Sequence, residues 1–198
     1  MNLKTSEVMV NNMFRISLLE EGADFVDLVG RRPTIPIKEK VIEVMESAPT
    51  GTVFFYDFNE VREINGSGVH EVIVKPIEWL CENYKSHDKY LFLKNLSRDY
   101  DHLYNIQITC NKEKVAVVAQ QEKSHTVIGD KAGEALVEIL DLVYQRKEIT
   151  AREVVDVLDK KLNLASTQLT KLFEMRLVSR REEQLEEGGR QFIYSSLF

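Results

Sequence analysis

The stretch Leu164-Ala-Ser-Thr-Gln-Leu-Thr-Lys-Leu-Phe-Glu-Met-Arg-Leu-Val178 contains the pattern on which the fold assignment depends. Leu169, Leu172 and Phe173 recur at the spacing of one face of an α-helix. Leu177 follows at the point where the chain is expected to leave that helix, and we predict that all four side chains pack together. The outward face of the helix would then present polar residues, namely Thr167, Gln168, Thr170, Lys171 and Glu174.

The flanking sequence predicts two further helices and a β-hairpin. Residues 135–143 place apolar side chains at helical spacing. Thr150-Ala-Arg-Glu153 is a capping box, in which the hydroxyl and the carboxylate satisfy free N–H groups at a helix start. We predict a short turn at Asn163-Leu-Ala165 and a third helix from about Ser166. The hairpin would consist of strands Leu177–Arg181 and Gln191–Ser195 around the loop Glu186-Glu-Gly-Gly189, whose glycines permit positive φ.

Together these elements resemble the winged helix-turn-helix domain of bacterial regulators, from residue 130 onward. The stretch 164–178 looks like the recognition helix and first wing strand, and Gly189-Arg-Gln-Phe-Ile-Tyr194 is similar to the returning strand. Arg176 stands where that family usually has a glycine, so the turn into the wing is expected to differ. The resemblance implies binding to double-stranded DNA through the residues Thr167, Gln168, Thr170, Lys171, Arg180, Arg181 and Arg190.

The chemistry of these side chains fits DNA, but their charge balance leaves an alternative open. Gln and Thr can read base edges, whereas Lys and Arg can hold phosphates. Between Lys171 and Arg190, however, five basic residues are matched by five acidic ones. A neutral surface binds DNA weakly unless a dimer doubles it. The alternative is that this module docks a protein or a second copy of the chain, for which the first helix offers Leu136, Leu140 and Val143.

The first half of the chain alternates strand-like and helix-like segments, which predicts an α/β layered sheet. Pro36 is expected to open a helix, and Pro76 to kink or divide a later one that spans about 69–84. Ser97 is expected to cap a further helix, whose second half, from Ile106, is left open between helix and strand. The predicted strands are 13–19, 53–58, 90–93, 115–119 and 125–128.

The segment Asp57-Phe-Asn-Glu-Val-Arg-Glu-Ile-Asn-Gly-Ser-Gly-Val69 resembles the signature of STAS domains, the family of anti-anti-sigma factors. The resemblance implies that Asp57 closes a strand and that Ser67 is phosphorylated by a partner kinase, which breaks a partner contact. Two departures are Asn65, where the family has an acidic residue, and Gly66 before the serine. The alternative for Ser67 is a helix N-cap, and Asp57 could equally organise the following turn.

The composition of the whole chain limits the classes of function. The net charge of −6 over 198 residues argues against a protein that coats nucleic acid by bulk electrostatics. No apolar run is long enough to cross a bilayer, and the sequence up to Met13 lacks a signal-peptide core, so we expect a cytoplasmic protein. Two distant cysteines and four scattered histidines predict no metal site. We expect no cofactor and no catalytic residue, because nucleophile elbows and phosphate-binding glycine motifs are missing.

Two hypotheses follow for a protein with a STAS-like domain over residues 1–129 and a winged helix-turn-helix over residues 130–198. The first is a transcriptional regulator, in which the front domain senses a partner or ligand and the second binds an operator as a dimer. The second is a protein-interaction adaptor in a phosphorylation-dependent pathway, with a kinase or anti-sigma-like partner and no DNA binding. The acidic wing tip favours the adaptor, and the polar helix face favours the regulator.

Overall fold

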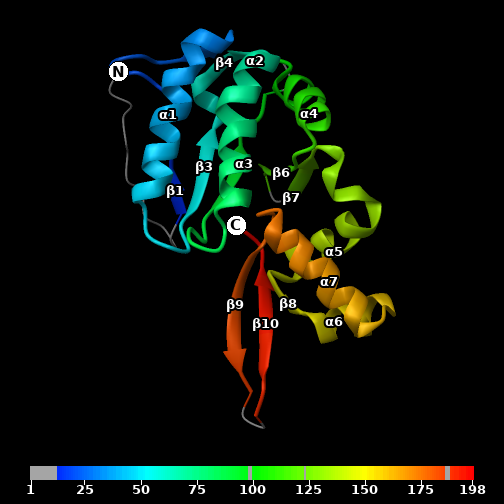
Figure 1. The fold of residues 1–198 in the computed structure, drawn as a ribbon. Helices are drawn as coiled ribbons and strands as arrows, with labels where there is room; N and C mark the ends of the chain where they lie inside the picture. The colour runs from blue at the N-terminus through cyan, green and yellow to red at the C-terminus, as the bar shows by residue number, and fades with distance from the viewer. Residues whose placement is uncertain (1–12, 98–99, 123, 186–187) are drawn as a thin grey trace. The chain divides into compact units, whose positions relative to one another are not determined.

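The computed structural model describes residues 13–97, 100–122, 124–185 and 188–198, which form a mixed α/β fold. The sheets contain both parallel and antiparallel strand pairs. The chain divides into two compact units, here called unit 1 (up to Lys131) and unit 2 (from Ala132), whereas the sequence placed the change at 129/130. Figure 1 shows the elements of both units.

Unit 1 is built on a five-stranded sheet whose strands are arranged in chain order. The pairs β1–β3, β3–β5 and β5–β6 are parallel, and β7 returns antiparallel to β6. The strands are β1 (Met13–Arg15), β3 (Val53–Asp57), β5 (Tyr90–Lys94), β6 (Val117–Gln121) and β7 (Ser124–Ile128). A separate parallel pair consists of β2 (Val26–Leu28) and β4 (Val61–Ile64). Strand β4 was not among the predicted strands, because its partner β2 lies far away along the chain.

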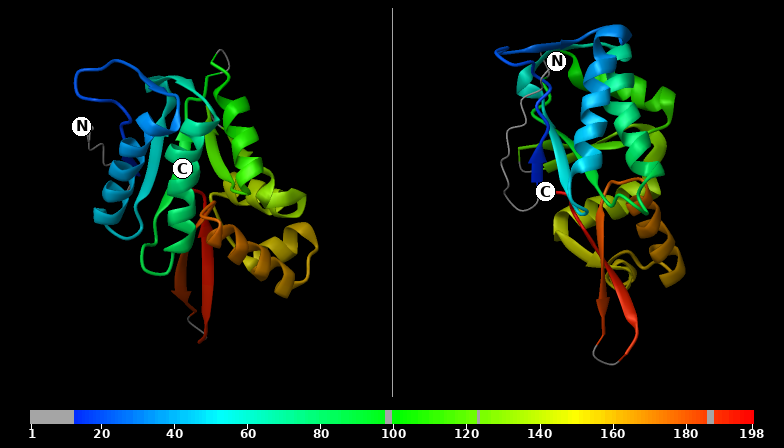
Figure 2. Two further views of the ribbon diagram at one scale, coloured as in Figure 1. Left: turned by 45° about the horizontal axis from the view of Figure 1, so that its top comes forward. Right: turned by 60° about the vertical axis from the view of Figure 1, so that its left-hand side comes forward.

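The helices of unit 1 lie on one face of this sheet, as Figures 1 and 2 show. Parallel strands that follow one another in chain order, joined by crossovers of one hand, place every connecting helix on the same side. The helices are α1 (Arg31–Ser47), the continuous run of α2 (Gly66–Val69), a π-helix (His70–Val74) and α3 (Lys75–Glu82), and α4 (His102–Glu113). Phe54, Tyr56 and Leu93 of the strands pack with these helices in one hydrophobic core.

Helix α1 begins at Arg31, five residues before the predicted start at Pro36, which lies inside it. Gly30 turns the chain with a φ of 85° and precedes the helix, and the Thr34 hydroxyl donates to the Gly30 carbonyl at 2.7 Å. At the other end, the buried Lys89 ammonium donates to the carbonyls of Met45 and Glu46. Burial lowers the pKa of Lys89, while these two carbonyls hold its hydrogen atoms.

The helical run 66–82 is divided near Pro76, as expected, because a π-helix ends at Val74 and α3 begins at Lys75. Pro76 has no N–H to donate to the carbonyl of Val72, four residues earlier, and the π-helix lies directly before it. The Tyr56 hydroxyl, which is fully buried, donates to that same Val72 carbonyl at 3.0 Å. The acceptor that proline leaves without its usual partner is therefore satisfied from the sheet.

Helix α4 includes the segment whose type was left open, since Ile106 to Cys110 are helical. Ser97 is not its cap, because Asp101 precedes the first helical residue. The Ser97 N–H instead donates to Nδ1 of the fully buried His102 at 3.2 Å. Burial lowers the pKa of His102, which keeps the ring neutral and able to accept this bond.

Unit 2 consists of three helices and a three-stranded antiparallel sheet, in the order α5, β8, α6, α7, β9, β10. In the sheet, β10 lies between β8 and β9. The helices are α5 (Gly133–Arg146), α6 (Ala151–Leu158) and α7 (Leu162–Glu174), and the strands are β8 (Glu148–Thr150), β9 (Ser179–Gln184) and β10 (Arg190–Ser195). The short strand β8 was not among the predicted elements.

The core of unit 2 follows the predicted burial pattern. Leu169, Leu172 and Phe173 of α7 are buried, as is Leu177. Leu136, Leu140 and Val143 of α5 are buried as well, so this face of α5 is not free for a partner chain. Gly188 and Gly189 have φ of 87° and 97°, as predicted for the hairpin loop, whose Glu186 and Glu187 lie outside the described residues. No helix in the described part of the chain is both long and apolar enough to span a membrane.

Candidate functional site

Helix α6 starts with the predicted capping box, which is confirmed. The Thr150 Oγ1 accepts the Glu153 N–H at 3.3 Å, and the Glu153 Oε2 accepts the Thr150 N–H at 2.7 Å. These two bonds fix the first turn, which includes Arg152. The Arg152 side chain is exposed, and no hydrogen bond or ion pair engages it within the described residues.

Helix α7 begins at Leu162, four residues before the predicted start near Ser166. The Lys161 carbonyl accepts the N–H groups of Leu164 and Ala165, both at 3.0 Å, so the expected turn at 163–165 is already helical. No side chain caps the start of α7, so the sequence contains little that marks its first residue. The change adds Asn163 to the exposed face of the helix.

The end of α7 explains how Arg176 replaces the usual glycine. Arg176 has a φ of 60°, and its N–H donates to the Phe173 carbonyl at 2.9 Å. The Leu177 N–H donates to the Leu172 carbonyl at 3.1 Å, which completes a Schellman motif. The left-handed conformation costs a non-glycine residue about 1–2 kcal/mol. The buried Arg176 guanidinium, 4.6 Å from the centre of the Phe173 ring, offsets part of that cost.

The outward face of α7 contains only part of the predicted set. Thr167, Lys171 and Glu174 are exposed as predicted, although the Thr167 hydroxyl donates to the Asn163 carbonyl at 2.8 Å. Asn163 and Ser166, which the prediction did not include, are exposed as well. The Thr170 hydroxyl instead lies 3.2 Å from the Tyr194 hydroxyl of β10, and Gln168 is half-buried. Oε1 of Gln168 is buried and has no hydrogen-bond partner in the described chain. The available polar face is therefore Asn163, Ser166, Thr167 and Lys171.

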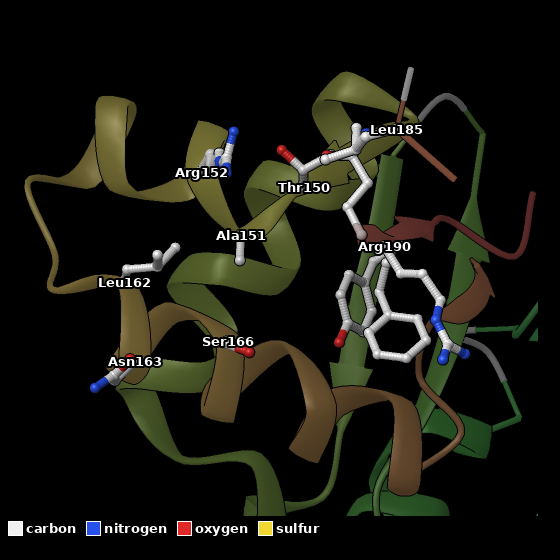
Figure 3. Close-up of a pocket in the computed structure, with 11 residues that line it drawn as sticks. Thr150, Ala151, Arg152, Leu162, Asn163, Ser166, Leu185 and Arg190 are labelled. Carbon is white, nitrogen blue, oxygen red and sulfur yellow. The ribbon is translucent and has the colours of Figure 1, made fainter. Parts of the chain in front are cut away.

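A hollow of about 310 Å³ opens between the start of α6, the first half of α7 and the hairpin (Figure 3). Its charged side chains, Arg152 and Arg190, are both cations. Leu162 and Phe192 contribute apolar surface, with exposed fractions of 49% and 41%. The full lining is Thr150, Ala151, Arg152, Leu162, Asn163, Ser166, Leu185, Arg190, Gln191, Phe192 and Tyr194.

The three hairpin arginines in the predicted DNA-binding set all have partners within unit 2. The Arg180 guanidinium lies between two rings, 3.9 Å from the centre of Phe173 and 4.3 Å from that of Phe192. Two ion pairs hold Arg181, to Glu148 at 3.1 Å and to Glu183 at 3.5 Å, and Arg190 pairs with Glu182 at 3.1 Å.

Three other cations of unit 2 remain available around α6 and α7. Arg152, Lys161 and Lys171 are exposed and have no side-chain partner among the described residues. Arg152 and Lys161 were not among the predicted site residues. The capping box, which places Arg152 in the first turn of an exposed helix, was the signal that could have found Arg152.

In unit 1, Asp57 ends β3 and organises the turn that follows. Its Oδ1 accepts the Asn59 N–H at 3.1 Å and the Asn95 Nδ2–H at 2.8 Å. Oδ2 lies 3.6 Å from the Arg15 guanidinium, which also pairs with the buried Glu60. Asp57 therefore fixes the carboxyl ends of three neighbouring strands.

Ser67 is not the N-cap of its helix, which corrects the alternative offered for this residue. The cap is Asn65, whose Oδ1 accepts the Gly68 N–H at 3.0 Å and the Gly30 N–H of the α1 start at 3.3 Å. Ser67 lies half-buried in the first turn, and its hydroxyl has no hydrogen-bond partner among the residues described. Asp57 and Ser67 share no hydrogen bond, so the structure does not join them in one contact.

The described residues contain no group of three or more His, Cys, Asp or Glu side chains that could hold a metal ion. Comparison of the chain with protein-family models, with curated proteins and with solved structures finds no match. Proposals about function therefore rest on two places in the structure. One is the surface formed by α6, α7 and the hairpin, and the other is the turn from Asn65 to Ser67.

Proposed function

We propose that the chain is a transcriptional regulator, with a winged helix-turn-helix in unit 2 that binds double-stranded DNA and a STAS-like sensing domain in unit 1. The element order α5, β8, α6, α7, β9, β10 supports the assignment of unit 2. One observation carries the DNA proposal. The exposed polar face of α7, with the unpaired Lys171, borders a hollow lined by the unpaired Arg152 and by Arg190, which pairs with Glu182.

The available side chains suggest how such a domain would divide its contacts. Asn163, Ser166 and Thr167 are exposed on α7 and can hydrogen-bond to base edges. Arg152, Lys161 and Lys171 are free to neutralise phosphates, because they form no ion pairs in the described chain. Arg180, Arg181 and Arg190 would contribute less, since each must first leave a ring or a carboxylate.

The first prediction concerns salt-dependent binding to duplex DNA by the full chain. We expect binding to weaken steeply as salt rises, and Arg152→Ala and Lys171→Ala each to reduce the slope of log affinity against log salt by about 1. Arg190→Ala should change the slope less, because Arg190 pairs with Glu182. Fluorescence anisotropy with a pool of genomic fragments, titrated at several salt concentrations, measures both quantities.

Arg146→Ala is the matched control for these variants. Arg146 is an exposed cation without a partner among the described residues, but it lies at the end of α5 and does not line the hollow. Its loss should leave the salt slope unchanged. If the chain retards no genomic fragment even at low salt, or if Arg146→Ala weakens binding as much as Arg152→Ala, the DNA proposal is wrong.

The second candidate function is the protein-interaction adaptor, and two observations favour it. Leu162 and Phe192 expose apolar surface beside the hollow, which is more typical of a protein contact than of a phosphate contact. Ser67 has a half-exposed position and no hydrogen-bond partner in the described chain, while Asn65 performs the capping. A phosphate on Ser67 would therefore break no internal hydrogen bond and would add about −1.5 to −2 charges at the surface.

For the adaptor, we expect a protein complex that depends on the charge of residue 67. Ser67→Glu should weaken a complex recovered from the source cells, whereas Ser67→Ala and Lys171→Ala should leave it intact. Affinity purification of the three variants, with quantified partners, makes the comparison. Recovery of no specific partner at any salt concentration, or equal loss with Ser67→Ala and Ser67→Glu, would count against the adaptor.

A further inference from the structure

The exposed face of α4 in unit 1 has an unusual concentration of apolar side chains. Tyr104 and Ile108 have exposed fractions of 65% and 49%, and Tyr100, just before the helix, has 53%. These are three of the five large apolar side chains that are exposed in the described part of unit 1. Tyr104 and Ile108 are four residues apart and share one face of the helix. The opposite face, with Ile106 and Cys110, is buried in the core.

The charges at the two ends of this face have opposite signs. Asp101 is exposed at the N-terminal end, and the Lys112 side chain, 79% exposed, lies at the C-terminal end on the same face as Ile108. Tyr100 lies beside the N-terminal end, because its ring stacks on that of His102, the first helical residue. One end of the face therefore has an acid and an aromatic ring. The other end has the Lys112 cation, whose Nζ lies 3.7 Å from Oε1 of the less exposed Glu113.

We propose that this face of α4 is a homodimer interface in which two copies of the helix pack antiparallel about a two-fold axis that passes midway between Tyr104 and Ile108, on the exposed side of the helix. A two-fold interface must be self-complementary, so that each residue meets the residue on the other side of the axis. Tyr104 of one copy then meets Ile108 of the partner. Lys112 of one copy approaches Asp101 and the Tyr100 ring of the other, which gives an ion pair and a cation–π contact.

Charge complementarity selects a second copy of this chain as the occupant. A parallel pairing would bring Lys112 against Lys112 and Asp101 against Asp101, so only the antiparallel pairing satisfies both ends. One flank of the face is polar and uncharged, because the Gln107 Nε2–H donates to Asn111 Oδ1 at 2.8 Å there. An apolar centre with a polar rim is the arrangement of protein interfaces. With few large anchors, we expect a dissociation constant in the micromolar range.

The dimer goes beyond the proposed function and does not depend on it. It would nevertheless strengthen DNA binding, because two copies of a weakly binding surface would contact the DNA together. Unit 2 has a near-neutral reading surface, and its helix α5, the dimerisation element considered first, is buried at Leu136, Leu140 and Val143. A dimer through α4 would place two copies of unit 2 in one particle and double the DNA contact.

Sedimentation of the full chain over about 1–100 µM tests the interface without DNA, so its result is separate from that of the DNA experiment. We expect a reversible monomer–dimer equilibrium that Ile108→Glu and Tyr104→Glu each weaken by about tenfold or more. Phe25→Glu is the matched control, because Phe25 is 58% exposed in unit 1 but lies outside α4. Circular dichroism spectra confirm that each variant is folded.

A charge exchange makes the geometry of the interface testable. Asp101→Lys and Lys112→Asp should each weaken the dimer, since each places like charges opposite one another, and the double variant should restore it. The left-handed backbone of Asp101 tolerates lysine, because Lys114 adopts the same conformation at the other end of α4. A chain that stays monomeric over the whole range would overturn the proposal. So would equal weakening by Phe25→Glu and Ile108→Glu, or a double variant no stronger than the single ones.

Discussion

Gly68→Ala is expected to destabilise unit 1 by about 3 kcal/mol or more, the upper end of the range for overpacking. A Cβ at Gly68 would lie 1.8 Å from the Leu28 carbonyl oxygen and 2.7 Å from the Leu28 carbonyl carbon. Both are backbone atoms of β2, and the Asn65 N–H donates to the same Leu28 oxygen at 3.3 Å, so neither side can yield without losing that bond. Urea unfolding followed by fluorescence measures the loss, because the single tryptophan, Trp79, packs against the core of unit 1.

Gly66→Ala is the control, two residues away in the same helix start. A Cβ there would lie 3.3 Å from the Thr109 Oγ1, a side-chain atom, and Gly66 is exposed. We expect a change within about 0.5 kcal/mol. If both variants lose the same stability, close packing against β2 is not the reason for glycine at position 68. The expected contrast would show that close packing against β2 requires glycine at position 68.

Local rules were sufficient where both partners of an interaction lie close together in the sequence. The spacing of Leu169, Leu172 and Phe173 predicted the buried face of α7, and Thr150 with Glu153 predicted the start of α6. The continuous apolar stretches Val53–Phe58 and Tyr90–Leu93 predicted β3 and β5. In each case burial or capping depends on a repeat that can be read within a few residues.

The predictions failed where the decisive partner is remote. Val61–Ile64 is a strand because β2 pairs with it, and β2 lies more than thirty residues earlier. The Val72 carbonyl, which Pro76 leaves without its usual donor, accepts the hydroxyl of Tyr56 from the sheet. Asn65 rather than Ser67 caps α2, and it also holds the start of α1 through Gly30. Helix and strand propensities, which depend on neighbouring residues, cannot predict these contacts.

The same limit applies to the candidate site. The sequence identified Arg180, Arg181 and Arg190 as cations near a reading helix, but which of them are engaged depends on strand register. Because β8 lies beside β10, Glu148 comes within 3.1 Å of Arg181. Arg190 reaches Glu182 across the β9–β10 pair. Arg152 was overlooked because the capping box was interpreted only as a helix start, and the lack of a partner for Arg152 in the described chain is visible only in the structure.

Phe173→Ala is expected to destabilise unit 2 by about 3–5 kcal/mol, whereas Phe192→Ala should cost only about 1 kcal/mol. The two rings enclose the same Arg180 guanidinium, but Phe173 is 5% exposed within the core and Phe192 is 41% exposed on the hairpin. Removal of Phe173 leaves a cavity beneath α7, and removal of Phe192 uncovers one side of the cation. Urea unfolding followed by far-ultraviolet circular dichroism compares the two variants.

The Phe192→Ala variant also tests whether Arg180 contacts DNA. If the rings hold Arg180 away from phosphate, Phe192→Ala should release it and raise the salt slope of DNA binding toward about one additional contact, and Arg180→Ala in the parent chain should leave the slope unchanged. The double variant Phe192→Ala/Arg180→Ala should then return to the parent slope. A parent chain whose slope falls with Arg180→Ala alone would show that Arg180 contacts DNA despite its two rings, and the assignment of Arg152, Lys161 and Lys171 as the main phosphate contacts would need revision.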